Sequence, residues 1–119
     1  MSYTGLFNWS RGFVVILSVL SSSRSPGILK EKHAVHSIEI VQMKFVPADL
    51  KTNIGDTVVF INNDFVPHDI TEAGTKAWSS SPIPPGQTWR MEVKQALDYF
   101  CSIHPVMKGK IIIKDDGLN

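Results

Sequence analysis

The sequence predicts an all-β domain, a Greek-key sandwich of two sheets with about seven or eight strands. Three observations lead to this fold class. Short runs of β-branched and aromatic residues recur along the chain, turn-forming residues end each run within a few positions, and no stretch keeps a helical period. The 119 residues, 43% hydrophobic and 19% charged, have the length and composition of one folded domain.

The strands predicted in the first half are residues 37–45, 50–54, 57–61 and 68–71. Ile38 and Ile40 alternate with polar neighbours at the start of the first run, which continues without a turn signal until Pro47. Gly55 ends the second run. The third run is rich in β-branched residues and stops at residues 62–64 (Asn-Asn-Asp), which favour a turn.

The second half begins with a long loop and ends with three further strands. Residues 72–86 contain three consecutive serines and three prolines, so we expect a loop there. The strands that follow are predicted at residues 88–93, 97–101 and 110–114. Trp89, Met91 and Val93 alternate with polar residues, so we expect all three side chains to face one core.

The beginning of the chain has the parts of a secretory signal. Arg11 precedes an apolar run at residues 12–20, and the serines Ser21 to Ser23 follow it. We predict a signal peptide at residues 1–23, cut after one of these serines; a buried N-terminal helix or strand is the alternative. The run is well short of the ~20 residues of a membrane-spanning helix, and no cysteine follows it for lipid attachment, so we expect no membrane anchor.

The rest of the chain divides into a polar lead-in at residues 24–35 and the sandwich domain at residues 36–119. A cleaved signal implies a periplasmic or otherwise exported protein. The net charge of +1, with no basic cluster, argues against nucleic-acid binding. We expect a monomer.

The residues that carry chemistry gather near the C-terminus. Cys101, the only cysteine, is followed three residues later by His104 and three residues after that by Met107. A thiolate, an imidazole and a weak thioether are the ligands of a copper electron-transfer site, which requires a second histidine. His68, at the start of a predicted strand, is placed to supply it. Zinc is the competing metal, but it seldom takes methionine.

With these residues the chain resembles the cupredoxins, the blue copper proteins, over residues 36–114. The matching segments, in order, are residues 45–50 (FVPADL), 55–58 (GDTV), 62–64 (NND) and 66–68 (VPH). The resemblance implies that His68, Cys101, His104 and Met107 bind one type 1 copper ion, which cycles between Cu(II) and Cu(I). It also implies that the protein carries single electrons between larger redox proteins.

The short ligand loop is most similar to that of the amicyanin branch of the family. This similarity implies a dehydrogenase as electron donor and a c-type cytochrome as acceptor. Asp69 stands where many members have asparagine, and we expect it to tie the two ligand loops together through Ser102. Ile103 stands where amicyanins have proline, so its N–H is free to donate to the Cys101 sulfur.

The apolar residues Pro67, Pro105 and Val106 surround the predicted site and are expected to form a patch that docks redox partners. A periplasmic copper-binding protein for storage or delivery is the alternative function, although exposed Met or His clusters are missing. An enzyme is not expected, because four ligands leave no open position for substrate. His33 and His36 would lie on opposite faces of a strand, which argues against a second metal site.

Overall fold

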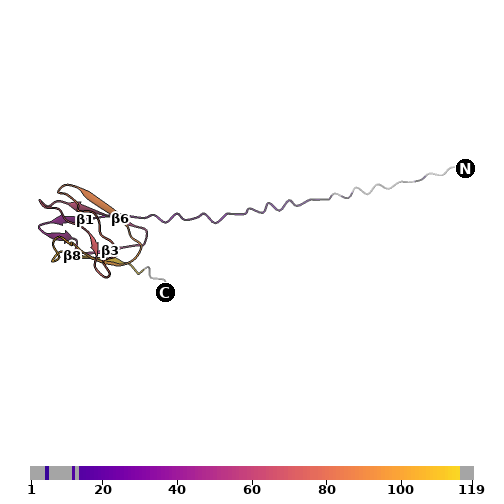
Figure 1. Ribbon diagram of the computed structural model, residues 1–119. Coiled ribbons are helices and arrows are strands. Elements are labelled where there is room, and N and C mark those ends of the chain that lie inside the picture. The colour runs from indigo at the N-terminus through magenta and orange to yellow at the C-terminus, as the bar shows by residue number, and fades with distance from the viewer. Residues whose placement is uncertain (1–4, 6–11, 13, 116–119) are drawn as a thin grey trace. The chain divides into compact units, whose positions relative to one another are not determined.

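The computed structural model describes residues 5, 12 and 14–115, and it divides into two units, Met1–Lys30 and Glu31–Asn119 (Figure 1). In the first unit, residues 14–30 belong to no helix or strand and their side chains are exposed. The predicted signal segment lies partly outside the described residues, which do not include Arg11 or Phe13, and it stays a prediction. Within the described part of the chain, no helix is long and apolar enough to cross a membrane.

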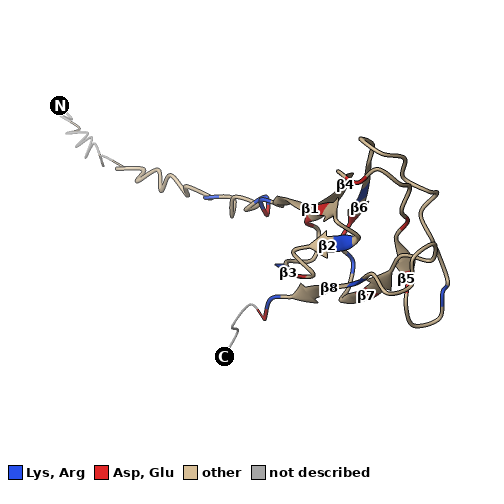
Figure 2. Ribbon diagram, turned by 90° about the vertical axis from the view of Figure 1, so that its left-hand side faces the viewer, with Lys and Arg blue, Asp and Glu red and all other residues tan. Residues whose placement is uncertain are grey.

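The second unit is an all-β sandwich with eight strands in its described residues, which confirms the predicted fold class. The strands are β1 (Val35–Val41), β2 (Lys44–Val46), β3 (Asp49–Thr52), β4 (Thr57–Asn62), β5 (Thr71–Glu72), β6 (Thr88–Glu92), β7 (Leu97–Phe100) and β8 (Lys108–Ile113). One sheet has the order β2-β1-β4-β6 and the other β3-β8-β7-β5. Figure 2 shows these two layers edge on.

Two parallel pairings join strands that are not neighbours in the sequence. β1 lies parallel to β4, and β3 lies parallel to β8, whereas the other pairs are antiparallel. The predicted ligand segments follow β4 and β7. These two strands lie in different sheets, and each is an internal strand of its sheet. The chain that leaves β4 and the chain that leaves β7 meet at the same end of the sandwich, as the bond from Asp69 N–H to Cys101 Sγ shows.

The single strand predicted over residues 37–45 is wrong, because the chain makes a hairpin there. Gln42 and Met43 adopt φ values of 50° and 58° between β1 and β2. Positive φ at both central residues is the geometry of a two-residue hairpin turn, normally supplied by Asn-Gly. Here the Asp64 carboxylate accepts hydrogen bonds from both turn N–H groups, at 3.0 and 2.9 Å. A distant side chain thus stabilises a turn that has no local signal.

The strand predicted at residues 68–71 is also mostly absent. β5 contains only Thr71 and Glu72, and His68 makes an isolated bridge with Ile83. The N–H of Ile70 donates to Ser80 Oγ at 2.9 Å, and the carbonyl of Ile70 accepts from the N–H of Ser80 at 2.8 Å, so scattered bonds to residues 79–83 replace a regular ladder. The segment is therefore held in place as an irregular loop, which leaves its side chains free to face the site.

The core between the sheets confirms the expected orientation of β6 and contains an aromatic cluster. Val93 is fully buried, and Trp89 and Met91 pack partly buried against the core. The Phe60 and Tyr99 rings meet edge to face, with centroids 5.3 Å apart. Edge-to-face contacts of this kind stabilise a core beyond the area that they bury. The floor beneath the ligand loops is therefore densely packed.

Candidate metal centre

Four of the residues predicted as ligands lie at one end of the sandwich. Cys101 comes directly after β7, and His104 and Met107 lie in the loop that leads to β8. His68 follows the bend that leaves β4. Cys101 and His68 are fully buried, Met107 is 2% exposed and His104 is half-buried. The chain therefore buries one thiol and one imidazole completely and leaves the second imidazole partly exposed to solvent.

The donor atoms of three of these residues form a small triangle. Cys101 Sγ lies 3.8 Å from His68 Nδ1 and 3.8 Å from His104 Nδ1, and the two Nδ1 atoms are 3.2 Å apart. A first-row metal ion about 2.05 Å from each nitrogen and about 2.3 Å from the sulfur, with ligands about 120° apart, would space them about 3.6 and 3.8 Å apart. The triangle has the size of a trigonal metal site.

No other three-residue group of this kind, drawn from His, Cys, Asp and Glu, occurs in the described residues. Two imidazole nitrogens that face each other at 3.2 Å present two lone pairs to one point, which is unfavourable without a proton or a cation between them. A soft thiolate with two imidazoles suits copper. The donor set and its geometry therefore both fit this metal.

The ligand loop is held by its own backbone. The N–H of Cys101 donates to the carbonyl of Met107 at 3.0 Å, and the N–H of Met107 donates to the carbonyl of His104 at 2.9 Å. These bonds close the loop between Cys101 and Met107, and the Met107 side chain is packed in the core cluster. The spacing of three residues thus forms a compact turn, not an open loop.

A carboxylate orients the buried histidine. Asp64 Oδ2 lies 2.9 Å from His68 Nε2, so the N–H of that nitrogen donates to the carboxylate and Nδ1 keeps its lone pair toward the triangle. The N–H of Met43 lowers the pKa of Asp64 most, with His68 and Gln42 acting in the same direction and burial opposing them. The sequence marks Asp64 only as a turn residue, and its position four residues before His68 is the one signal there that could indicate this role.

Asn62 holds the loop that contains Asp64. Its side-chain amide donates to the carbonyls of Val66 and Ile83, both at 2.9 Å, and its Oδ1 accepts from the N–H of Asp64 at 2.9 Å. Asn62 itself is fully buried. Its side chain therefore supplies the hydrogen bonds that hold the backbone of the first ligand loop, which has no paired strand there.

The predicted tie between Asp69 and Ser102 is present. Asp69 Oδ1 accepts from the N–H of Ser102 at 2.7 Å and from the Thr71 hydroxyl at 3.1 Å, while Oδ2 accepts from the Ser102 hydroxyl. Asp69 is only 4% exposed. A buried carboxylate with three donors links the loop after β4 to the loop after β7, and so sets the separation of His68 from Cys101.

The expected bond from the Ile103 N–H to the Cys101 sulfur is not formed, so this prediction is wrong. Within the described residues, the backbone donor to the sulfur is the N–H of Asp69, at 3.4 Å. The sulfur is buried on the side of the first ligand loop, where Asp69 follows His68 directly. Ile103 lies on the outer side of its loop and is 43% exposed.

The two ligand loops expose apolar side chains, among them a large one that the expected docking patch does not include. Val106 is 83% exposed, and Pro67 and Pro105 are exposed. Phe65, in the first ligand loop, is 96% exposed. An aromatic ring in water cannot be told from a buried one by residue type alone, so only the structure could place it.

In the described residues, neither His33 nor His36 belongs to a group of three or more His, Cys, Asp or Glu side chains that could hold a metal ion. The Nε2 atom of His36 lies 2.8 Å from Asp56 Oδ2, while the His33 ring lies against the backbone of Gly55, a residue with φ of +91°. His36 thus has a structural partner, and no third ligand joins the two imidazoles.

Comparison with known proteins agrees with this geometry. Residues 32–114 match the family model of copper-binding proteins of the plastocyanin/azurin type. The chain is 29% identical over 83 residues to amicyanin of Paracoccus denitrificans and 26% identical over 83 residues to amicyanin-alpha of Methylorubrum extorquens, in each case over 65% of this chain. The match spans 63% of the length of the Paracoccus protein and 70% of that of the Methylorubrum protein.

Solved structures give the same result. A Cu(I) form of an amicyanin variant superposes with a TM-score of 0.62 at 26% identity, covering 67% of this chain and 82% of that one. A copper-containing nitrite reductase of Thermus scotoductus superposes with a TM-score of 0.60 at 26% identity, but only 22% of its chain is covered. The similarity to this reductase is therefore to one part of a much larger chain.

Proposed function

Because this chain belongs to the plastocyanin/azurin family of copper-binding proteins, whose members carry electrons and are not enzymes, we propose that it is an exported one-electron carrier with a single type 1 copper centre. The observation that carries this proposal is the triangle of one sulfur and two nitrogen atoms at 3.2–3.8 Å. The proposed ligands are His68, Cys101, His104 and Met107.

When bound, the copper supplies a one-electron couple between Cu(II) and Cu(I). The residues of this chain hold its surroundings constant. His68 keeps one ring orientation because Asp64 holds its outer nitrogen, and Asp69 ties the two ligand loops together. The Cys101 sulfur is fully buried and accepts a hydrogen bond from the N–H of Asp69. Little rearrangement is then needed when the charge of the centre changes by one.

The half-buried His104 ring provides the proposed point of electron exchange. Exposed apolar side chains belong to the two ligand loops, and the proposal takes them to form an apolar rim around this ring: Phe65, Pro67, Ile103, Pro105 and Val106. Small apolar contact surfaces suit brief encounters between redox proteins. The similarity to amicyanins implies a dehydrogenase as donor and a c-type cytochrome as acceptor, and both are part of the proposal.

The experiment is a copper titration followed by optical spectroscopy. The domain should bind one Cu(II) and show intense thiolate-to-copper absorption in the visible, and Cys101→Ser should abolish that absorption while the fold is retained. A colourless complex, or colour that survives Cys101→Ser, would overturn the assignment. Rapid loss of copper to a chelator together with slow reduction and reoxidation would favour copper delivery over electron transfer.

A further inference from the structure

β6 is the longest of the four edge strands in the described residues. It has five residues, whereas the other edge strands β2, β3 and β5 have three, four and two. Very short edge strands and prolines protect a sheet against pairing with another chain. β6 has neither protection, so a further strand could add to the β2-β1-β4-β6 sheet beside it.

The bonds at both ends of β6 show which of its residues face β4. The N–H of Asn62 donates to the carbonyl of Gln87 at 2.9 Å, and the N–H of Val93 donates to the carbonyl of Asp56 at 2.8 Å. In an antiparallel pair, every second residue exchanges backbone hydrogen bonds with the neighbouring strand. The odd-numbered residues of β6 therefore bond to β4, and the even-numbered residues turn their backbone groups to the free edge.

The free edge of β6 consists of the N–H and carbonyl groups of Thr88, Arg90 and Glu92. Within the described residues, β6 pairs with β4 alone, and no loop backbone bonds to these groups. Hollows of about 440 and 300 Å³ lie along the strand, and Trp89 lines both of them. The space beside β6 is therefore open to another chain.

Opposite charges stand on this edge without partners of their own. Arg90 and Glu92 are exposed on the outer face of the sheet, and neither belongs to an ion pair in the part of the chain that the structure describes. Their side chains lie two residues apart on the same face of the strand. A strand that carries the reverse order of charges would pair with both of them.

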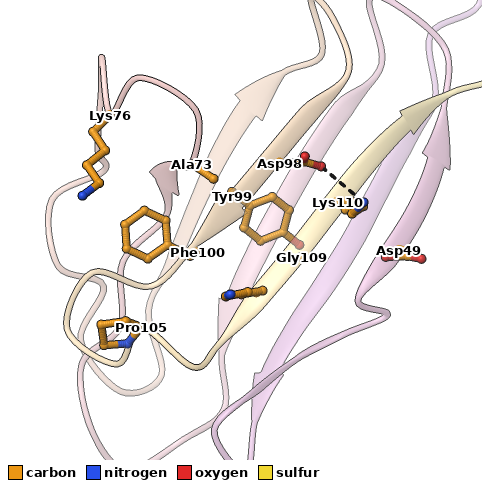
Figure 3. A pocket seen from close by; sticks show the side chains of 10 residues that line it. Asp49, Ala73, Lys76, Asp98, Tyr99, Phe100, Pro105, Gly109 and Lys110 are labelled. Atoms are coloured by element: carbon orange, nitrogen blue, oxygen red, sulfur yellow. Dashed lines mark ion pairs between the residues drawn. The ribbon is translucent and has the colours of Figure 1, made fainter.

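Several lysines of the other sheet differ in this respect, because they have neighbours within the chain. Figure 3 shows Lys110 joined to Asp98, with 3.9 Å between Nζ and Oδ1. The Lys76 ammonium lies 5.9 Å from the centre of the Phe100 ring, whose register partner is Lys108. The unpaired, opposite charges of β6 are thus the stronger signal of a missing strand.

We propose that β6 pairs antiparallel with β6 of a second copy of this chain, about a two-fold axis at Met91. In this register, Arg90 of each copy lies opposite Glu92 of the other, and each such pair exchanges its free backbone hydrogen bonds. The contact uses the same residues on both copies, as a two-fold interface requires. The two four-stranded sheets then form one continuous sheet.

Charge and backbone direction together select this register. A shift that puts the axis at Arg90 would use the same backbone groups, but it would place Arg90 opposite Arg90, and like charges directly opposite are unfavourable. A shift by one residue would bring free backbone groups opposite groups that already bond to β4. A second copy therefore offers the sequence that completes this edge.

Apolar side chains on the inner side of β6 add to the contact. The Trp78 ring stacks on Trp89, with centroids 6.0 Å apart and planes 29° from parallel, and Trp78 is 36% exposed. Both rings line one hollow together with Met91. With the axis at Met91, the Met91 side chains of the two copies face each other, and burial of these apolar groups favours association.

The pairing leaves the proposed copper centre of each copy free. Gln87, directly before β6, bonds to Asn62, which holds the first ligand loop. Because the two β6 strands run in opposite directions, the copper end of one copy lies beside the other end of its partner. The monomer expected from the sequence is then in equilibrium with a dimer, and this inference does not rest on the proposed carrier function.

Sedimentation of the copper-loaded protein from micromolar to millimolar concentration tests the pairing. A reversible monomer–dimer equilibrium is expected. Arg90→Glu places a glutamate opposite Glu92, and Glu92→Arg places an arginine opposite Arg90, so each variant should weaken the dimer roughly tenfold or more. Lys51→Glu makes the same charge change as Arg90→Glu at an exposed position of β3 and should associate as the unmodified protein does.

An equimolar mixture of the two β6 variants separates the proposed pairing from a general effect of charge. In a mixed dimer, every residue at position 90 again faces the opposite charge at position 92. The mixture should therefore dimerise at concentrations where neither variant does so alone. Equal thermal midpoints of all variants check that the fold is retained.

Amide hydrogen exchange locates the contact. The N–H groups of Arg90 and Glu92 should exchange more slowly as the concentration rises, whereas exchange of the Met91 N–H, which bonds to β4, should not depend on concentration. Concentration-dependent protection confined to Phe65 and Val106 would place the interface at the apolar rim and overturn the proposal.

Three sedimentation results would also overturn the pairing: a monomer at every concentration, a dimer unaffected by Arg90→Glu, and a mixture of the two β6 variants that stays monomeric. Loss of the visible copper band would instead refute the proposed function, because no residue tested here belongs to the copper site.

Discussion

The Asp64 carboxylate links the buried His68 of the copper centre to the turn between β1 and β2. Its Oδ2 lies 2.9 Å from His68 Nε2, and its two oxygens also accept the N–H groups of Gln42 and Met43. One carboxylate therefore orients a proposed ligand and stabilises the β1–β2 hairpin. Any change at this position should affect both the metal site and the fold of the first hairpin.

Replacement of Asp64 by alanine should weaken copper binding. The His68 ring loses the partner that fixes its tautomer and orientation, and removal of such outer partners typically lowers metal affinity about 10- to 100-fold. A competitive titration of Cu(II) against a chelator measures the change. Asp49→Ala, at an exposed position, is the control and should bind as the unmodified protein does. An unchanged affinity in Asp64→Ala would contradict the orienting role.

Replacement of Asp69 by alanine should lower the free energy of unfolding by about 1.5–3 kcal/mol or more, because a buried charged acceptor and its three donors are lost. Ser102→Ala removes one donor only and should have a smaller effect. Denaturant titration of both apoproteins measures the difference. If the two variants lost equal stability, the carboxylate would not be the centre of this tie.

Replacement of Val106 by lysine should slow electron exchange with a protein partner and leave the visible spectrum nearly unchanged. Val106 is 83% exposed beside His104, so a charge there disturbs the apolar rim without contact with the buried donor atoms. Ile54→Lys is the matched control, since Ile54 is 58% exposed in the turn before β4, at the other end of that strand. Stopped-flow rates at several ionic strengths decide the matter, and equal rates for the two variants would argue against docking at the rim.

Acid should destabilise the protein in part through Asp56. The N–H of Asn53 contributes most to lowering its pKa from 3.8 to about 2, followed by His36 and the N–H of Ala34, while burial acts the other way. A lowered pKa in the folded state means that this stabilisation is complete above pH 3.8 and is lost as the pH falls toward 2.

Asp56→Asn should therefore reduce the loss of stability between pH 4 and pH 2, and the variant should already be less stable at pH 7. Chemical denaturation of the apoprotein at pH values across this range measures the slope. Asp49→Asn serves as the control, because Asp49 is exposed and its carboxylate accepts no buried hydrogen bond within the described residues. An unchanged slope in Asp56→Asn would show that other carboxylates dominate acid unfolding.

Much of the fold was predictable because its signals are local. Alternation at Ile38 and Ile40, the β-branched run of β4 and the turn residues between strands predicted an all-β sandwich without reference to distant residues. The hairpin at Gln42 was not predictable in this way. Its turn depends on the Asp64 carboxylate, 22 residues away, and neither Gln nor Met favours positive φ.

Three of the four candidate ligands were predictable for the same reason. Cys101, His104 and Met107 are spaced three apart, and a single loop of the chain places them together, so their chemistry can be read from neighbouring residues. The donor of the hydrogen bond to the Cys101 sulfur was not predictable from the sequence. Its donor, Asp69, is 32 residues away, and the packing of two loops decided between this N–H and that of Ile103.

The sequence by itself determined the all-β fold class, the soft donor set and the chemistry of one copper ion, because each of these depends mainly on residue type and short-range spacing. Only the tertiary structure decided which nitrogen of His68 faces the sulfur, how exposed Phe65 is, and that Lys76 and Lys108 flank Phe100. Those features arise where segments distant in the sequence pack against one another. Hydrogen bonding and burial at such contacts depend on the whole fold, and no local pattern encodes them.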